Sequence, residues 1–90
     1  MITWLNPHLC DPPHRVVRFD QVACLADQFS QTGWSNNEPA LIGYVLGNRV
    51  QLISGTHRWA AAIEADLKKI PIVLRKTSDI YESWGNLQNG

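Results

Sequence analysis

The sequence lacks any long run of apolar residues, and this absence limits where the protein can reside. No segment approaches the roughly 20 consecutive apolar residues that a membrane-spanning helix requires. The first ten residues also lack the basic start and the apolar stretch of a signal peptide. We therefore expect a cytoplasmic protein that has no membrane partner.

An excess of positive charge is also missing. Lysine and arginine together number 8, aspartate and glutamate also number 8, and the formal net charge is zero. A dedicated nucleic-acid-binding protein is usually clearly basic, because contacts with phosphate supply much of its affinity. The charge balance therefore counts against DNA binding as the main task, although it permits a local basic patch.

Cysteine is scarce. The two cysteines, Cys10 and Cys24, do not form a C-x-x-C pair, and no histidine cluster with metal-ligand spacing accompanies them. A disulfide framework or a zinc site would need a different pattern. We expect two reduced thiols and predict no metal ligands from this pattern.

The chain is short and of ordinary globular composition. It has 90 residues, of which 44% are hydrophobic, enough for one domain with a modest core. We expect a single domain over residues 1–90, with its core at about 5–76 and a short C-terminal helix at about 79–87.

Apolar periodicity predicts two longer helices. Phe19–Thr32 carries apolar residues at helical spacing, with Asp20 as its N-cap and Gly33 as the residue that ends it. Thr56–Leu67 is rich in alanine, a strong helix former, and carries a second apolar stripe.

The segments between these helices predict strands. Leu41–Leu46 and Arg49–Ile53 flank a Gly-Asn hairpin signal, and Ile70–Leu74 is a further apolar run. The proline-rich lead-in is extended or turn-like, and residues 15–18 are either a short strand or its continuation. This order predicts a mixed α/β fold, a small sheet with a β-hairpin covered by two to three helices.

The junction before the second helix is the most informative segment. Gly55 lets a ligand approach the backbone, and Thr56 adds a hydroxyl donor. His57 can donate through one or both ring nitrogens, and Arg58 presents a fork that matches phosphate oxygens. Free N–H groups and the positive end of the helix dipole attract anions at the same place. The junction therefore predicts a phosphate site, with plain helix capping as the alternative.

These residues also resemble a known family, the ParB/sulfiredoxin superfamily. Its members carry a glycine, a variable residue, His or Arg, then Arg and a small-residue helix, followed by a strand that opens with Ile-Pro-Val. The matching segments here are Gly55–Ala62 and Ile70–Val73, and Leu25–Gly33 is similar to the family's first helix. The resemblance covers roughly residues 5–76.

The resemblance implies a nucleotide site. In partition ParB proteins the motif grips the triphosphate of CTP, in sulfiredoxins it grips ATP, and other relatives are reported as kinases, NTPases or nucleases. By this resemblance the ligand is an NTP, ATP or CTP, with Mg²⁺ as a companion ion. Gln28 falls where the family helix often offers Ser or Thr to the nucleotide, and the phosphates would be held by Gly55, Thr56, His57 and Arg58.

Two departures narrow what the resemblance implies. Thr56 stands where sulfiredoxins carry their catalytic cysteine, which argues against sulfiredoxin activity. Partition proteins continue into a Glu-Asn-Leu/Ile-Gln-Arg element and further domains, whereas Gly85 here replaces the metal-linked glutamate of that element. We therefore expect a compact core domain rather than a CTP-switched DNA clamp.

We predict a nucleoside-triphosphate-binding protein, with weak Mg²⁺-dependent NTPase activity as an extension. Hydrolysis would need a carboxylate near the phosphates, and Glu38 is the candidate catalytic acid, with Asp27 and Glu82 as alternatives. Two alternatives stay open: a ParB-like DNA-binding protein or nuclease, and a non-enzymatic adaptor or inhibitor of a host or partner protein. We expect Trp34 to pack in the core or at its edge, with stacking on a nucleotide base as the alternative. We expect His14 to lie at the surface. The compact form suits a phage or mobile element.

Overall fold

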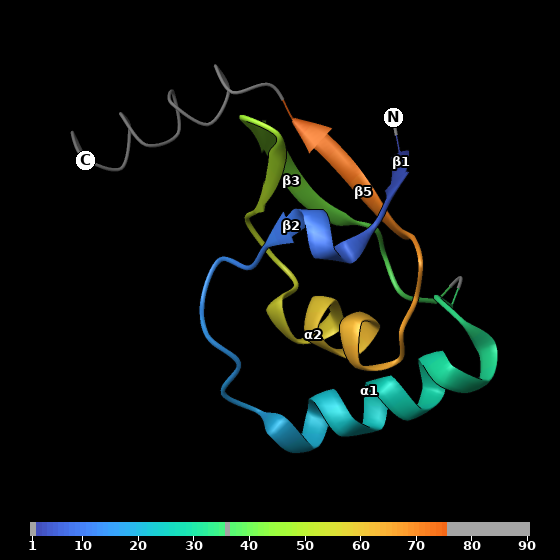
Figure 1. The fold of residues 1–90 in the computed structure, drawn as a ribbon. Coiled ribbons are helices and arrows are strands. Elements are labelled where there is room, and N and C mark those ends of the chain that lie inside the picture. The colour runs from blue at the N-terminus through green and yellow to red at the C-terminus, as the bar shows by residue number, and fades with distance from the viewer. Residues whose placement is uncertain (1, 36, 76–90) are drawn as a thin grey trace.

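The computed structural model describes residues 2–35 and 37–75, so the helix expected at about 79–87 lies outside the described residues. Its elements in chain order are β1 (Ile2–Leu5), the 3₁₀ helix η1 (Pro7–Leu9), β2 (Cys10–Asp11), α1 (Phe19–Thr32), β3 (Leu41–Leu46), β4 (Arg49–Leu52), α2 (Thr56–Glu64) and β5 (Ile70–Arg75). Both α-helices lie on one side of the sheet (Figure 1). The mixed α/β fold with a hairpin covered by helices is confirmed.

One five-stranded sheet joins the two ends of the described chain. Its strand order is β1-β5-β3-β4-β2, with β3 and β4 forming the expected antiparallel hairpin and β5 running parallel to β3. The sequence did not predict β1 or β2, because both are too short for apolar periodicity to be clear, and β2 also lies between prolines. Residues 15–18 form no strand. No helix in the described part of the chain is long and apolar enough to cross a bilayer.

The core lies between the sheet and the two helices. Four strand residues have no exposed surface, namely Leu41, Leu52, Ile70 and Ile72. Strand register places them on one face of the sheet, since partners across a ladder point the same way. Phe29 from α1 packs into the same cluster. The alanines of α2 let it approach closely, and Ala61 and Ala62 are fully buried.

The start of α1 differs from the expectation. Arg18, not Asp20, is the N-cap residue, and it makes no side-chain capping hydrogen bond. The reason is tertiary. The backbone N–H groups of Val17 and Arg18 donate to Nε2 of His57, at 3.3 and 3.1 Å. A side chain from α2 therefore fixes the entry to α1.

The end of α2 also differs, because α2 stops at Glu64 rather than Leu67. Asp66 adopts the left-handed conformation with φ +58°, which an aspartate tolerates better than most residues. The N–H of Leu67 then donates to the carbonyl of Ala62, and that of Asp66 to the carbonyl of Ile63. This is the hydrogen-bond pattern of a Schellman motif, with Asp66 in the usual place of glycine.

Position 55 requires glycine for two reasons, its backbone conformation and the lack of room for a side chain. Its φ is +83°, a region that L residues rarely adopt, and it stands at the N-cap of α2. A Cβ there would overlap Cδ2 of Leu41, a fully buried residue at the start of β3. The turn into α2 is thus locked against the first residue of β3.

Alanine substitution tests this double constraint. Gly55→Ala should lower the free energy of unfolding by about 2–4 kcal/mol, because backbone strain adds to overpacking. Gly47 is the matched control, since its φ is +65° but a Cβ there meets nothing within 4 Å. Gly47→Ala should cost only about 1 kcal/mol, from the backbone alone. Urea denaturation measures both, and equal losses would contradict the role given to Leu41.

Candidate phosphate site

A hollow of about 390 Å³ opens at the start of α2. Its walls come from four places, namely the loop between β2 and α1, the first half of α1, the loop before β3 and the turn into α2. The lining residues are His14, Gln21, Leu25, Glu38, Pro39, Gly55, Thr56, His57 and Arg58. The fold therefore brings Glu38 together with all four residues of the predicted phosphate turn.

Thr56 is one of the residues that line this hollow, and it is an unusual buried group. Its side chain is 1% exposed, yet its hydroxyl has no hydrogen-bond partner among the described residues. A buried hydroxyl without a partner costs about 1–3 kcal/mol. Thr56 is also the first residue of α2, where backbone N–H groups lack acceptors within the helix. Unused donors therefore gather at this point.

His57 has a defined tautomer. Its Nε2 accepts the two backbone N–H groups at the start of α1, so the neutral ring must carry its proton on Nδ1. The sequence left open which nitrogen could meet a ligand. The structure restricts the choice to Nδ1, because Nε2 is already occupied within the protein.

Arg58 braces the opposite wall of the hollow. Its Nη1 donates to the backbone carbonyl of Pro39 at 2.6 Å. A guanidinium has five N–H donors, so this contact leaves most of them for another acceptor. Two neighbouring residues of α2 thus hold the two loops that flank the hollow, His57 the loop before α1 and Arg58 the loop before β3.

Glu38 is the acid that faces the hollow. Its backbone is fixed from two sides, since its carbonyl accepts from Nε1 of Trp34 at 3.0 Å and its N–H donates to the carbonyl of Ser35 at 3.0 Å. A carboxylate held beside free donors can carry a divalent cation when an anionic ligand supplies further oxygens. The turn into α2 supplies positive charge for that anionic ligand, through Arg58 and the N-terminal end of the helix.

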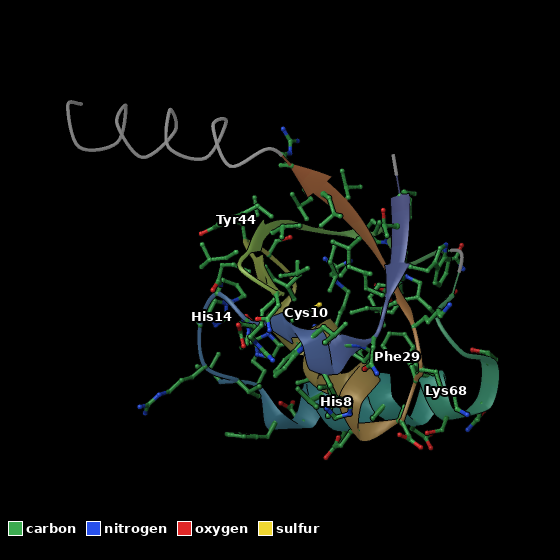
Figure 2. The ribbon with its side chains drawn as sticks, turned by 45° about the horizontal axis from the view of Figure 1, so that its top comes forward. His8, Cys10, His14, Phe29, Tyr44 and Lys68 are labelled. Carbon is green, nitrogen blue, oxygen red and sulfur yellow. The ribbon has the colours of Figure 1, made fainter. Side chains whose placement is uncertain are left out.

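The structure adds two side chains that the sequence did not place here. His14 lies on the loop between β2 and α1 (Figure 2), and its ring centroid is 6.0 Å from that of His57. Its Nδ1 bonds the carbonyl of Arg15, so Nε2 is the nitrogen that can meet a ligand. Gln21 lines the wall from α1, whereas Gln28, seven residues further along, is exposed and is not a lining residue. Gln21 and Gln28 are seven residues apart, about two turns of α1, and therefore lie on the same side of the helix. This spacing is the sequence signal that could have suggested Gln21.

Neither cysteine belongs to this hollow. Cys10 is the first residue of β2 (Figure 2) and is buried, and burial raises the pKa of its thiol to about 11. Cys24 is exposed on α1. Because a thiolate is the reactive form, Cys10 is chemically inert at neutral pH. Among the described residues, no three His, Cys, Asp or Glu side chains gather closely enough to hold a metal ion by themselves.

Comparisons with solved structures support the fold. C-terminally truncated ParB from Caulobacter crescentus, complexed with CTP-γ-S, matches with a TM-score of 0.73 and 21% identity over 89% of this chain and 47% of that chain. The same protein complexed to the centromeric parS site matches with a TM-score of 0.67 and 21% identity, over 97% of this chain and 47% of that chain. Sulfiredoxin from Arabidopsis thaliana matches with a TM-score of 0.70 and 21% identity, over 91% of this chain and 94% of that chain. The chain spans about half the length of the ParB chains.

Sequence comparison gives the family. No curated protein matches the chain. The ParB N-terminal domain family matches residues 5–85, which include every element from η1 to β5 and the whole candidate site. This match and the shared fold agree with the resemblance seen in the phosphate turn. The chain belongs to the ParB N-terminal domain family.

Proposed function

We propose that this protein binds a nucleoside triphosphate, with the phosphates in the hollow at the start of α2. The unpartnered hydroxyl of Thr56 carries the proposal. A phosphate oxygen beside it would accept a hydrogen bond from this hydroxyl, for which the described residues supply no acceptor. Binding would thereby remove the free-energy cost of the unpartnered group. The same oxygens would meet the free N–H groups and the positive end of the helix dipole.

Charged and polar side chains extend this phosphate site. The guanidinium of Arg58 would grip phosphate oxygens with the donors that Pro39 leaves free. His57 would donate through Nδ1, and His14, another lining residue, would meet the ligand through Nε2. A volume of about 390 Å³ falls in the range of small-ligand sites, roughly 300–1,000 Å³. The ParB neighbour in complex with CTP-γ-S supports a nucleotide as the class of ligand.

The carboxylate of Glu38 fits a Mg²⁺ ion that is shared with the phosphates. Mg²⁺ commonly binds through one or two carboxylates together with substrate phosphate oxygens and water. The bound ion would neutralise phosphate charge, and in hydrolysis it would stabilise charge on the leaving oxygens. Weak NTPase activity belongs to this proposal as its catalytic extension.

DNA binding is the second candidate function. The neighbour bound to parS supports it at the level of the fold. In this chain, however, Arg49 is engaged by Asp11 at 3.0 Å. Of the remaining arginines, Arg15 and Arg18 lie in the loop before α1, Arg58 on α2 and Arg75 at the end of β5. The hollow with its gathered donors therefore favours a nucleotide. A gel-shift and nicking assay at low salt with Mg²⁺ separates the two candidates.

Thermal stability against a nucleotide panel tests the proposal. A nucleotide at 100 times its Kd should add roughly 2.7 kcal/mol, which raises Tm by about 10 °C or more in a domain of this size. Arg58→Ala should weaken binding at least roughly tenfold, because it removes charge-assisted hydrogen bonds. Arg75→Ala is the matched control, since Arg75 lies outside the hollow. Equal binding by both variants, or no shift with any nucleotide, would overturn the assignment.

Thr56→Val separates a ligand role from a structural one. Valine has nearly the same shape but no hydroxyl, so the free protein should become more stable by about 1 kcal/mol as the unpartnered group disappears. Nucleotide affinity should fall by about tenfold in the same variant. Urea denaturation and calorimetric titration measure the two effects. A loss of stability without nucleotide would mean that the hydroxyl already has a structural partner.

Glu38→Gln tests the cation role. Removing the carboxylate should tighten nucleotide binding without Mg²⁺ by about threefold, since it removes repulsion between like charges. The gain in affinity on adding Mg²⁺ should shrink, and any phosphate release should fall by at least about 100-fold. Calorimetry with and without Mg²⁺ and a phosphate-release assay give the answer. An unchanged response to Mg²⁺ would remove Glu38 from the site.

A further inference from the structure

The two edges of the sheet are protected very differently. At one edge β2 pairs over only two residues, Asp11 is held by Arg49, and two prolines follow. Charge, proline and short length are the usual means by which proteins block pairing at an edge strand. At the other edge, β1 has four residues, Ile-Thr-Trp-Leu, without charge, proline or glycine. Within the described residues β1 pairs with β5 alone.

The side chains of β1 divide between the two faces of the sheet. Thr3 and Leu5 stand opposite core residues of β5, so they point toward the helices. Ile2 and Trp4 therefore point to the other face, and they are 54% and 52% exposed. Both helices lie on the core side (Figure 1). The unprotected edge thus carries two exposed apolar side chains in alternate positions.

These side chains border a second hollow, of about 350 Å³. Trp4 and Ile2 form one side, Trp34 and the loop before β3 form the other, and Pro71 lies beneath. Trp34 is already rigid. Its ring stacks on Phe29 with centroids 5.1 Å apart, and its Nε1 bonds the carbonyl of Glu38. The hollow is therefore preformed, which lowers the entropy lost on binding.

The charge of the second hollow selects its occupant. Glu38 is the single charged residue among those that line it, and the rest are apolar apart from Ser35. Two tryptophan faces and one carboxylate favour a cation on an apolar stem, because the ring quadrupole and the negative charge act together. An arginine side chain meets both conditions, since it stacks on aromatic rings and pairs with carboxylates.

We propose that β1 is a docking edge for an extended peptide of a partner protein, which adds as a sixth strand and places an arginine or lysine side chain between Trp4 and Glu38. Strand addition supplies main-chain hydrogen bonds, and the pocket supplies selectivity for one side chain. A second copy of this chain fits less well. Its own β1 offers no basic group to Glu38.

Two short peptides test the proposal without nucleotide, so its outcome is independent of the phosphate site. Both are seven residues long, blocked at both ends and built from threonine and valine, with arginine or glutamine at the centre. The arginine peptide should shift the amide signals of β1 and the indole signal of Trp4 in NMR titration. It should bind about fivefold more tightly than the glutamine peptide.

Variants assign the binding to this surface. Trp4→Ala should lower the affinity for both peptides by about tenfold. Glu38→Gln should remove the preference for the arginine peptide over the glutamine peptide. Phe19→Ala is the matched control, since Phe19 is 73% exposed and lies outside both hollows. Equal binding of the two peptides, or shifts away from β1, would overturn the proposal. So would a dimer in sedimentation that Trp4→Ala converts to monomer, because the edge would then belong to a second copy.

Discussion

The turn into α2 is the constraint on which the rest of the structure depends. Gly55 must be left-handed, and its Cα must lie against Leu41 at the start of β3. This contact fixes where α2 begins relative to the sheet. From that position His57 reaches back to the loop before α1, and Arg58 reaches across to the loop before β3. One turn of backbone therefore organises both walls of the candidate site as well as the entry to α1.

The same turn sets the stability of the protein against the proposed binding of a ligand. A domain of this size has a small core, so each unsatisfied buried group is a noticeable fraction of its stability. Thr56, one of the lining residues of the hollow, nevertheless has a buried hydroxyl without a partner among the described residues. The protein also uses His57 and Arg58 as braces, although both retain donors that face the hollow. A site that is rigid before binding orders few groups when a ligand arrives.

Glu38 connects the two hollows. It lines both of them, together with Pro39, and its backbone is fixed by Trp34. One hollow gathers donors around the start of a helix and suits an anion. The other combines aromatic faces with the carboxylate and suits a cation. A single acidic residue on a braced loop thus lies between two surfaces of opposite preference, which gives the loop before β3 a central place in both proposals.

The sequence by itself determined most of the local elements and pointed to a candidate phosphate turn. Helical spacing located α1 at Phe19–Thr32, and alternation with a Gly-Asn turn located the hairpin. The four residues from Gly55 marked the candidate site. Each of these signals lies within a few neighbouring residues. Only the tertiary structure decided the rest. It added β1 and β2, which are strands only because partners pair with them, and it replaced the expected cap at Asp20 by His57, about 40 residues away in the chain. It brought His14 and Gln21 to the hollow and left Gln28 outside, because proximity between segments far apart in the chain follows from packing and not from local pattern.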